Sequence, residues 1–183
     1  NAQEGYGYGA GELWRHSVAT AIISRLLVKR INVKEDPILF TSALLHDIGK
    51  IVLNNFVSKE MVNMMELAIK EKLSLVEVER AVFGIDHAEL GGIVAENWQF
   101  PSMLSNSIKN HHKSPGKFIP NIVAWVRLSN LVYHLYLANS VYSHHQEIIS
   151  NIRQSILFQF KLKKEDIDQV MTEIPEELKK VEM

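Results

Sequence analysis

Cysteine is absent from the 183 residues of the chain. The absence excludes a disulfide framework and any metal site built from thiolates. It also fits a reducing compartment, and we expect a cytoplasmic protein. With 46% hydrophobic and 22% charged residues, the composition is that of an ordinary globular domain.

Neither sign of charge is in excess, and no apolar run is long enough for a membrane span. The 20 Lys and Arg residues balance 21 Asp and Glu residues, for a formal net charge of −1. This charge gives no electrostatic basis for binding nucleic acid or an anionic membrane surface. The longest apolar stretches, 118–126 and 128–143, are separated by Arg127 and fall short of the roughly 20 residues that a transmembrane helix needs. We therefore expect neither nucleic acid nor membrane as a partner.

The length of the chain predicts a single domain with a sizeable core, over residues 1–183. The sequence begins with Asn1 rather than Met, so we expect a fragment of a longer chain. Residues 144–183 are more charged than the rest, and they are predicted to form C-terminal peripheral helices.

The pattern of apolar residues and helix caps is helical throughout. Apolar residues recur at helical spacing over 12–31, and Asp36-Pro37 is typical of a helix start. Ser74 with Glu77 forms a capping box, and Asp86 with Glu89 resembles a second. The predicted helices are 12–31, 37–55, a third from Ser58, 75–83, 87–98, 101–112, 120–138, 144–160, 163–173 and 175–182. No strand is predicted, and the fold class is all-α.

The polar residues of these helices form an unusual set. Of the eight histidines, several share predicted helices with apolar residues, and some have a carboxylate or a lysine nearby. The set comprises Glu12, His16, His46, Asp47, Lys50, His87, His111 and His112. Helical bundles build metal sites from inward-facing side chains on several helices. Imidazole and carboxylate suit Mn, Fe, Ni, Zn or Co, and Mg where oxygen ligands dominate.

Each histidine alone also has a simpler interpretation. His16 fits a core histidine, His87 a packed first-turn residue, and His111 with His112 favourable cations at a helix C-terminus. His46 and Asp47 fit such interpretations less well, because burying both beside Leu45 and Ile48 requires a partner. Four separate helices bring such residues in order, and this joint pattern favours a metal site.

The ordered set resembles the HD superfamily of metal-dependent phosphohydrolases, and especially its HDOD branch of bacterial signalling domains. The resemblance covers roughly residues 8 to 140 and rests on the stretches GELWRHSVATA, SALLHDIGKIVL, DHAELGGIVAENWQFP and IKNHH. It implies an HD-domain-like helical bundle with a metal pocket between its central helices.

The resemblance also implies roles for individual residues. His16, His46 and Asp47 match the ligands of a first metal, and Asp47 would bridge to a second. The second metal would be held by His87, His111 and His112. Lys50 matches a lysine that faces substrate phosphate, so Asp47 and Lys50 are the catalytic candidates, and Glu12 matches a supplementary carboxylate. The cofactors implied are one or two divalent ions of Fe, Mn, Ni, Zn or Mg.

Three departures from the superfamily bear on function. Asn130 stands where the superfamily carries a last aspartate ligand, the GYP-type signature is absent after His112, and nothing supplies the N-terminal helical lobe usual in HDOD domains. Two functions are therefore left open. One is a regulatory HDOD domain in signal transduction, which binds metal and has signalling proteins as partners. The alternative is an active phosphohydrolase or phosphodiesterase on a nucleotide, cyclic nucleotide or other phosphorylated small molecule. We favour the first.

Overall fold

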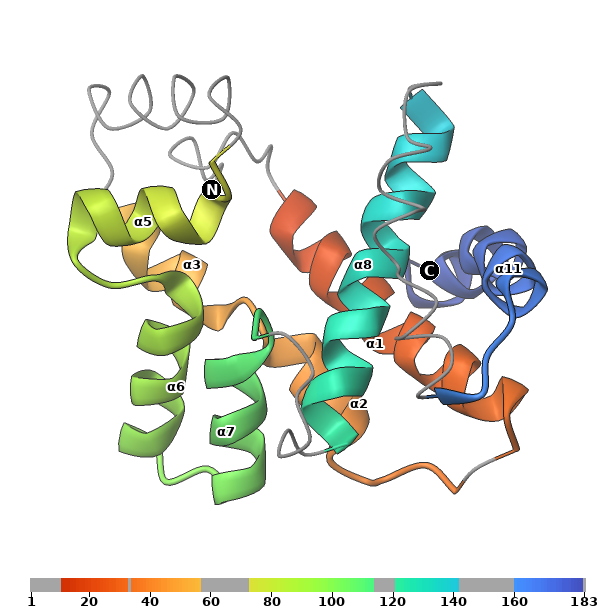
Figure 1. The fold of residues 1–183 in the computed structure, drawn as a ribbon, viewed down its shortest axis with the longest axis horizontal. Coiled ribbons are helices and arrows are strands. Elements are labelled where there is room, and N and C mark those ends of the chain that lie inside the picture. The colour runs from red at the N-terminus through yellow and green to blue at the C-terminus, as the bar shows by residue number, and fades with distance from the viewer. Residues whose placement is uncertain (1–10, 33, 57–72, 114–120, 142–159, 183) are drawn as a thin grey trace. The chain divides into compact units, whose positions relative to one another are not determined.

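The computed structural model describes residues 11–32, 34–56, 73–113, 121–141 and 160–182, and every regular element within these ranges is a helix (Figure 1). The predicted all-α fold is thus confirmed. The elements are α1 (Glu12–Arg30), α2 (Leu39–Leu45), α3 (Ile48–Leu53), the short 3-10 helix η2 (Asn54–Phe56), α5 (Leu75–Phe83), α6 (His87–Asn97), α7 (Ser102–Asn110), α8 (Asn121–Val141) and α11 (Lys164–Glu182). None of these helices combines the length and apolar character that a membrane crossing requires. The helices predicted from Ser58 and over 144–160 fall mostly outside the described residues.

Helix α5 begins and ends where its local sequence predicts. The Ser74 hydroxyl accepts a hydrogen bond from the backbone N–H of Glu77, and the Glu77 carboxylate accepts one from the backbone N–H of Ser74 at 2.8 Å. At the other end, Gly84 adopts the left-handed conformation with φ of 74°, which costs glycine little. The Asp86 side chain caps α6 by accepting from the backbone N–H of Glu89 at 2.8 Å.

The continuous helix predicted over 37–55 is wrong, because the chain breaks at His46 and Asp47 into α2 and α3. Asp47 has φ of −98° and ψ of 13°, outside the helical region, and its side chain does not cap α3. Successive side chains of a regular helix point roughly 100° apart. The break frees both side chains from that constraint, and the Asp47 carboxylate instead contacts residues from other helices.

The two helices predicted over 163–173 and 175–182 form one helix, α11, which continues through Pro175. Ile167, Val170 and Ile174 are buried along one side of α11, and Leu178 packs partly buried beside them. This apolar stripe crosses the proline, so side-chain burial holds the helix together where the local sequence alone predicts an interruption.

The chain divides into two compact units. The first unit comprises Asn1–Arg15 with Leu45–His112, and the second comprises His16–Leu44 with Lys113–Met183. The core of the second unit is built from α1, α2, α8 and α11, with Leu27, Val126 and Val170 among its fully buried side chains. That the whole chain forms one domain stays a prediction.

In the first unit, α3 packs against α6 and α6 packs against α7. The backbones of α3 and α6 approach so closely that a Cβ atom on Gly49 would lie 1.9 Å from the carbonyl oxygen of His87 and 2.8 Å from the backbone nitrogen of Gly91. Only glycine fits at position 49, and this contact sets the spacing between the start of α3 and the start of α6.

We expect Gly49→Ala to destabilise the protein by about 3 kcal/mol or more, at the upper end of overpacking, because backbone atoms must move to admit the methyl group. Chemical denaturation measures the change in the free energy of unfolding. Ile51→Ala serves as the control, since Ile51 lies on the same helix but is 47% exposed; its effect should stay within about 0.5 kcal/mol. Equal stabilities of the two variants would contradict the close approach.

Candidate metal centre

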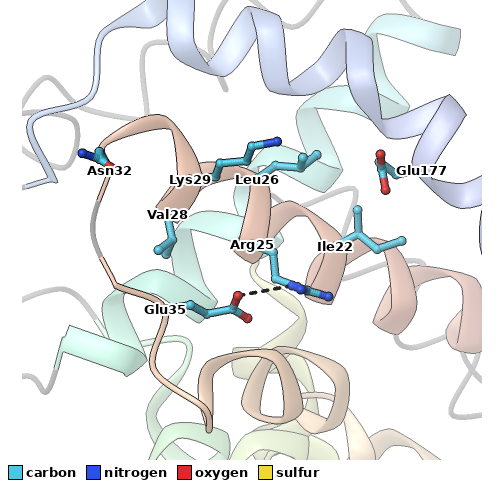
Figure 2. A pocket seen from close by; sticks show the side chains of 8 residues that line it. All are labelled: Ile22, Arg25, Leu26, Val28, Lys29, Asn32, Glu35 and Glu177. Atoms are coloured by element: carbon cyan, nitrogen blue, oxygen red, sulfur yellow. Dashed lines mark hydrogen bonds and ion pairs between the residues drawn. The ribbon is translucent and has the colours of Figure 1, made fainter.

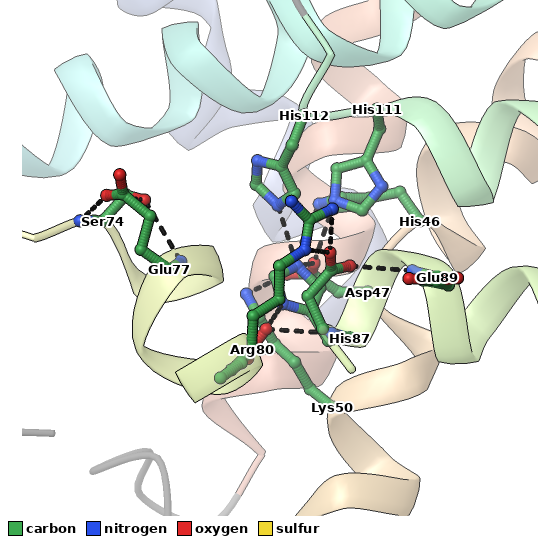
Figure 3. A network of polar contacts seen from close by, with 12 residues as sticks. His46, Asp47, Lys50, Ser74, Glu77, Arg80, His87, Glu89, His111 and His112 are labelled. Atoms are coloured by element: carbon green, nitrogen blue, oxygen red, sulfur yellow. Dashed lines mark hydrogen bonds and ion pairs between the residues drawn. The ribbon is translucent and has the colours of Figure 1, made fainter. Parts of the chain in front are cut away.

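The Asp47 carboxylate lies at the break between α2 and α3 and is 1% exposed. Its two oxygens face different partners (Figure 3). Oδ2 accepts a hydrogen bond from Lys50 Nζ at 2.6 Å and lies 3.4 Å from His46 Nε2. Oδ1 faces His87 Nε2 at 3.2 Å and His111 Nε2 at 3.5 Å. Asp47 therefore joins a lysine and a histidine on one side to two histidines on the other.

His87 is the first residue of α6, and both ring nitrogens make contacts. Nδ1 lies 2.6 Å from Glu79 Oε2 on α5, and the same carboxylate accepts the backbone N–H of His87 at 2.9 Å. A carboxylate only accepts, so Nδ1 carries a proton, and in the neutral ring the lone pair is on Nε2. That nitrogen also lies 2.8 Å from His112 Nε2.

His111 follows α7, and its ring is held in the same way. Nδ1 donates to the carbonyl oxygen of Ile108 at 2.6 Å, which leaves the lone pair of the neutral ring on Nε2. His111 Nε2 is buried and has no hydrogen-bond partner within the described part of the chain. It points toward an oxygen of Asp47, which is itself an acceptor.

These atoms match the ligand set of a metal ion. One ligand atom from each of Asp47, His87, His111 and His112 lies within 4.8 Å of the others. Acceptor atoms this close repel one another unless a proton or a metal ion lies between them. A proton on His87 Nε2 would form a hydrogen bond to Asp47 Oδ1, but His111 Nε2 would still have no partner. A divalent cation would satisfy both, and the imidazole-rich donor set is one that transition metals prefer.

The surroundings shift the pKa of the three imidazoles in different directions. Burial is the largest influence on His87 and lowers its pKa, but the hydrogen bonds to Asp47 and Glu79 outweigh it, so the net pKa is raised. Burial lowers the pKa of His111 despite its contact with Asp47. The pKa of His112 is lowered by loss of hydration of its ring and then by the neighbouring His111 and His87. His111 and His112 are thus held neutral, the form in which imidazole binds metal.

The structure brings most of the predicted site residues of the first unit together. Asp47, His87, His111 and His112 form the cluster, while His46 and Lys50 face its carboxylate from the other side. Glu12 is exposed in the first turn of α1, and its role stays a prediction. The same holds for His16 and Asn130, which belong to the second unit, where the His16 ring stacks edge-on against Tyr133 with centroids 4.7 Å apart.

Glu79 is a residue of this site that was not predicted from the sequence. This side chain is fully buried and holds His87 through two hydrogen bonds. The signal available was a carboxylate beside Val78 on the apolar side of α5, eight residues before the histidine that it contacts. Its neighbour Arg80 forms an ion pair with Asp86, the cap of α6, at 2.6 Å. Two adjacent residues of α5, Glu79 and Arg80, therefore bind the start of α6.

The second unit contains a cavity of about 460 Å³, and none of its lining residues belongs to the cluster (Figure 2). Ile22 and Leu26 are among its apolar lining residues, and Arg25, Lys29, Glu35 and Glu177 are its charged ones. Arg25 is already paired with Glu35 at 3.3 Å. The lining carries both signs of charge, whereas the cluster brings buried metal-binding donor atoms together, so the cluster is the better candidate for a functional site.

Comparison with known proteins identifies the family. A sequence model of the HDOD domain matches residues 1–114, a range that contains all four residues of the cluster together with His46 and Lys50. The chain belongs to the HDOD family. The resemblance proposed from the sequence is confirmed, and Asn130 lies outside the matched range of this HDOD chain.

Two solved structures share the fold of this HDOD chain. One, from Shewanella amazonensis SB2B and named "Putative phosphohydrolase", has a TM-score of 0.66 and 18% identity. The other, an HDOD domain protein with unknown function from Geobacter sulfurreducens, has a TM-score of 0.62 and 21% identity. They match 93% and 92% of this chain, which spans 61% and 63% of theirs. Identities this low establish the fold alone.

An uncharacterized protein from Treponema pallidum (strain Nichols) is 24% identical over 76 residues. The match covers 42% of this HDOD chain and 15% of the relative.

If the cluster holds a metal, we expect His111→Ala to weaken metal binding by more than about 100-fold, the upper range for loss of an outer partner, because the substitution would remove a ligand itself. Isothermal titration calorimetry with Mn²⁺ or Zn²⁺ measures the affinity, and circular dichroism checks the fold. His134→Ala is the matched control, since His134 is an exposed histidine of α8. Similar losses in both variants would mean that the cluster is not the binding site.

Proposed function

We propose that this HDOD domain binds a divalent metal ion through Asp47, His87, His111 and His112, and that it acts as a regulatory domain in signalling. The observation that carries the proposal is His111 Nε2, a buried lone pair without a hydrogen-bond partner among the described residues, aimed at a carboxylate oxygen 3.5 Å away. A divalent cation between the two atoms would satisfy both of them while His111 stays in the neutral form that its lowered pKa favours.

The donor atoms support a proposal about which metals bind and how many. Three imidazoles and one carboxylate favour Fe, Mn, Ni or Zn over Mg, which prefers oxygen ligands. Since Oδ1 and Oδ2 of Asp47 face opposite partners, a second ion beside His46 would share this carboxylate as a bridge. His16, Asn130 and Glu12 are proposed as further ligands on the strength of the sequence resemblance alone.

The alternative function is a phosphohydrolase acting on a nucleotide or another phosphorylated small molecule. It is supported by the name of the Shewanella relative and by Lys50, an ammonium group beside the cluster that could meet an anionic group. A bound metal would supply an activated water and would polarise phosphate oxygens. We favour the regulatory role, because Lys50 is 4% exposed and already bonded to Asp47, and because Asn130 would be a weaker ligand than aspartate.

We expect chelation to lower the melting temperature of protein purified with its metal, and added Mn²⁺ or Fe²⁺ to restore it. A ligand that binds only the folded state stabilises it by about 2.7 kcal/mol at a hundredfold excess over its dissociation constant. Elemental analysis measures the metal content, and calorimetry measures the melting temperature before chelation, after chelation and after metal is added back. A melting curve that responds to neither treatment would remove the basis for a metal site.

The same metal-loaded protein separates the two roles when it is offered bis-p-nitrophenyl phosphate and a panel of nucleotides. Turnover that Lys50→Ala abolishes would favour the phosphohydrolase. Metal binding without turnover would favour the regulatory domain.

A substitution at Asn130 tests whether this residue is also a metal ligand. Its Oδ1 is buried and has no hydrogen-bond partner within the part of the chain that the structure describes. If Asn130 is a ligand, Asn130→Asp replaces a neutral amide ligand with a negatively charged carboxylate. The substitution should then tighten metal binding. If it is not, a new buried carboxylate should destabilise the fold by several kcal/mol. Melting temperatures with and without metal decide: destabilisation that metal does not reverse would place Asn130 outside the site.

A further inference from the structure

We propose that Glu79 is a positioning residue that fixes the tautomer and orientation of the His87 ring, and so presents His87 Nε2 to a metal. The inference rests on the proposed metal site and adds a residue outside the ligand set. The Glu79 carboxylate is 0% exposed, and its Oε2 lies 2.6 Å from His87 Nδ1 and 2.9 Å from the backbone nitrogen of the same residue.

The two hydrogen bonds act on different parts of His87. The bond to the backbone N–H fixes the first residue of α6, and the bond to Nδ1 fixes the rotation of the ring. An imidazole that donates from Nδ1 presents its lone pair on Nε2. That nitrogen is the one directed at Asp47 Oδ1 and His112. Without the carboxylate, the ring could carry its proton on Nε2, where it would block a metal.

The charge of Glu79 adds to its geometry. A carboxylate that accepts from a ligating imidazole raises the basicity of that ligand, and loss of such a partner costs roughly 10–100-fold in metal affinity. The carboxylate is held by α5, whose own start is fixed by the Ser74 capping box, and Arg80 next to it pairs with the cap of α6. The capping box at Ser74 and the ion pair between Arg80 and Asp86 therefore hold Glu79 in place. A residue that positions a ligand must itself be held in this way.

A purely structural role for Glu79 is the competing explanation, since a carboxylate near the N-terminus of α6 also stabilises the helix. The two roles differ in what they do to the ring. Helix stabilisation would leave the tautomer of His87 and the metal affinity unchanged in any variant that folds.

The test compares Glu79→Gln, Glu79→Ala and the control Glu89→Gln, which removes a carboxylate from the first turn of α6. Long-range ¹H–¹⁵N NMR of the metal-free protein, at a pH where the ring is neutral, reports the tautomer of His87. Titration calorimetry with Zn²⁺ reports the affinity. In Glu79→Gln the amide oxygen still accepts from Nδ1, so we expect the tautomer to persist and the affinity to fall about tenfold. In Glu79→Ala we expect the Nδ1–H tautomer to be lost and the affinity to fall towards about 100-fold. Glu89→Gln should change neither.

A folded Glu79→Ala variant with the wild-type tautomer and wild-type affinity would overturn the inference. If Glu79→Ala does not fold, a folded Glu79→Gln variant with unchanged affinity would do the same. If the wild-type chain binds no metal, the proposed function fails, and the tautomer of His87 in the variants still decides the role of Glu79.

Discussion

Burial of the Asp47 carboxylate is the constraint on which the first unit depends. A carboxylate removed from water is costly unless charges and donors surround it. Here Lys50 donates a hydrogen bond to Oδ2 at 2.6 Å, and the imidazoles of His87 and His111 approach Oδ1. The break between α2 and α3 exists at this residue, and the backbones of α3 and α6 meet two residues later at Gly49. The break in the helix, the close packing of α3 on α6 and the cluster thus all adjoin one buried charge.

Much of the first unit could be predicted because its signals are local. The cap at Ser74 and the glycine at 84 fix α5 within a few residues of chain, and the structure follows them. The break at His46 and Asp47 could not be predicted in this way, because it depends on contacts with residues about 40 to 65 positions further along the chain. Likewise, the continuation of α11 through Pro175 depends on a core that other helices provide.

In the candidate site, too, some residues could be predicted from the sequence and one could not. The clustering of Asp47, His87, His111 and His112 could be predicted, since polar residues recurring on several apolar helices leave a pattern in the sequence, while their role as ligands stays a prediction. Glu79 left only a weak signal, its position beside Val78 on the apolar side of α5, because a single acidic residue forms no recurring pattern. Its role follows from the fold of α5 over the start of α6, which no spacing rule encodes.

Solvent access differs among the four cluster residues: three are buried and His112 is exposed. A divalent ion held by these four residues would have three ligands shut off from water and one, His112, at the boundary with solvent. Position 112 is therefore the side from which water or a small ligand would reach such an ion.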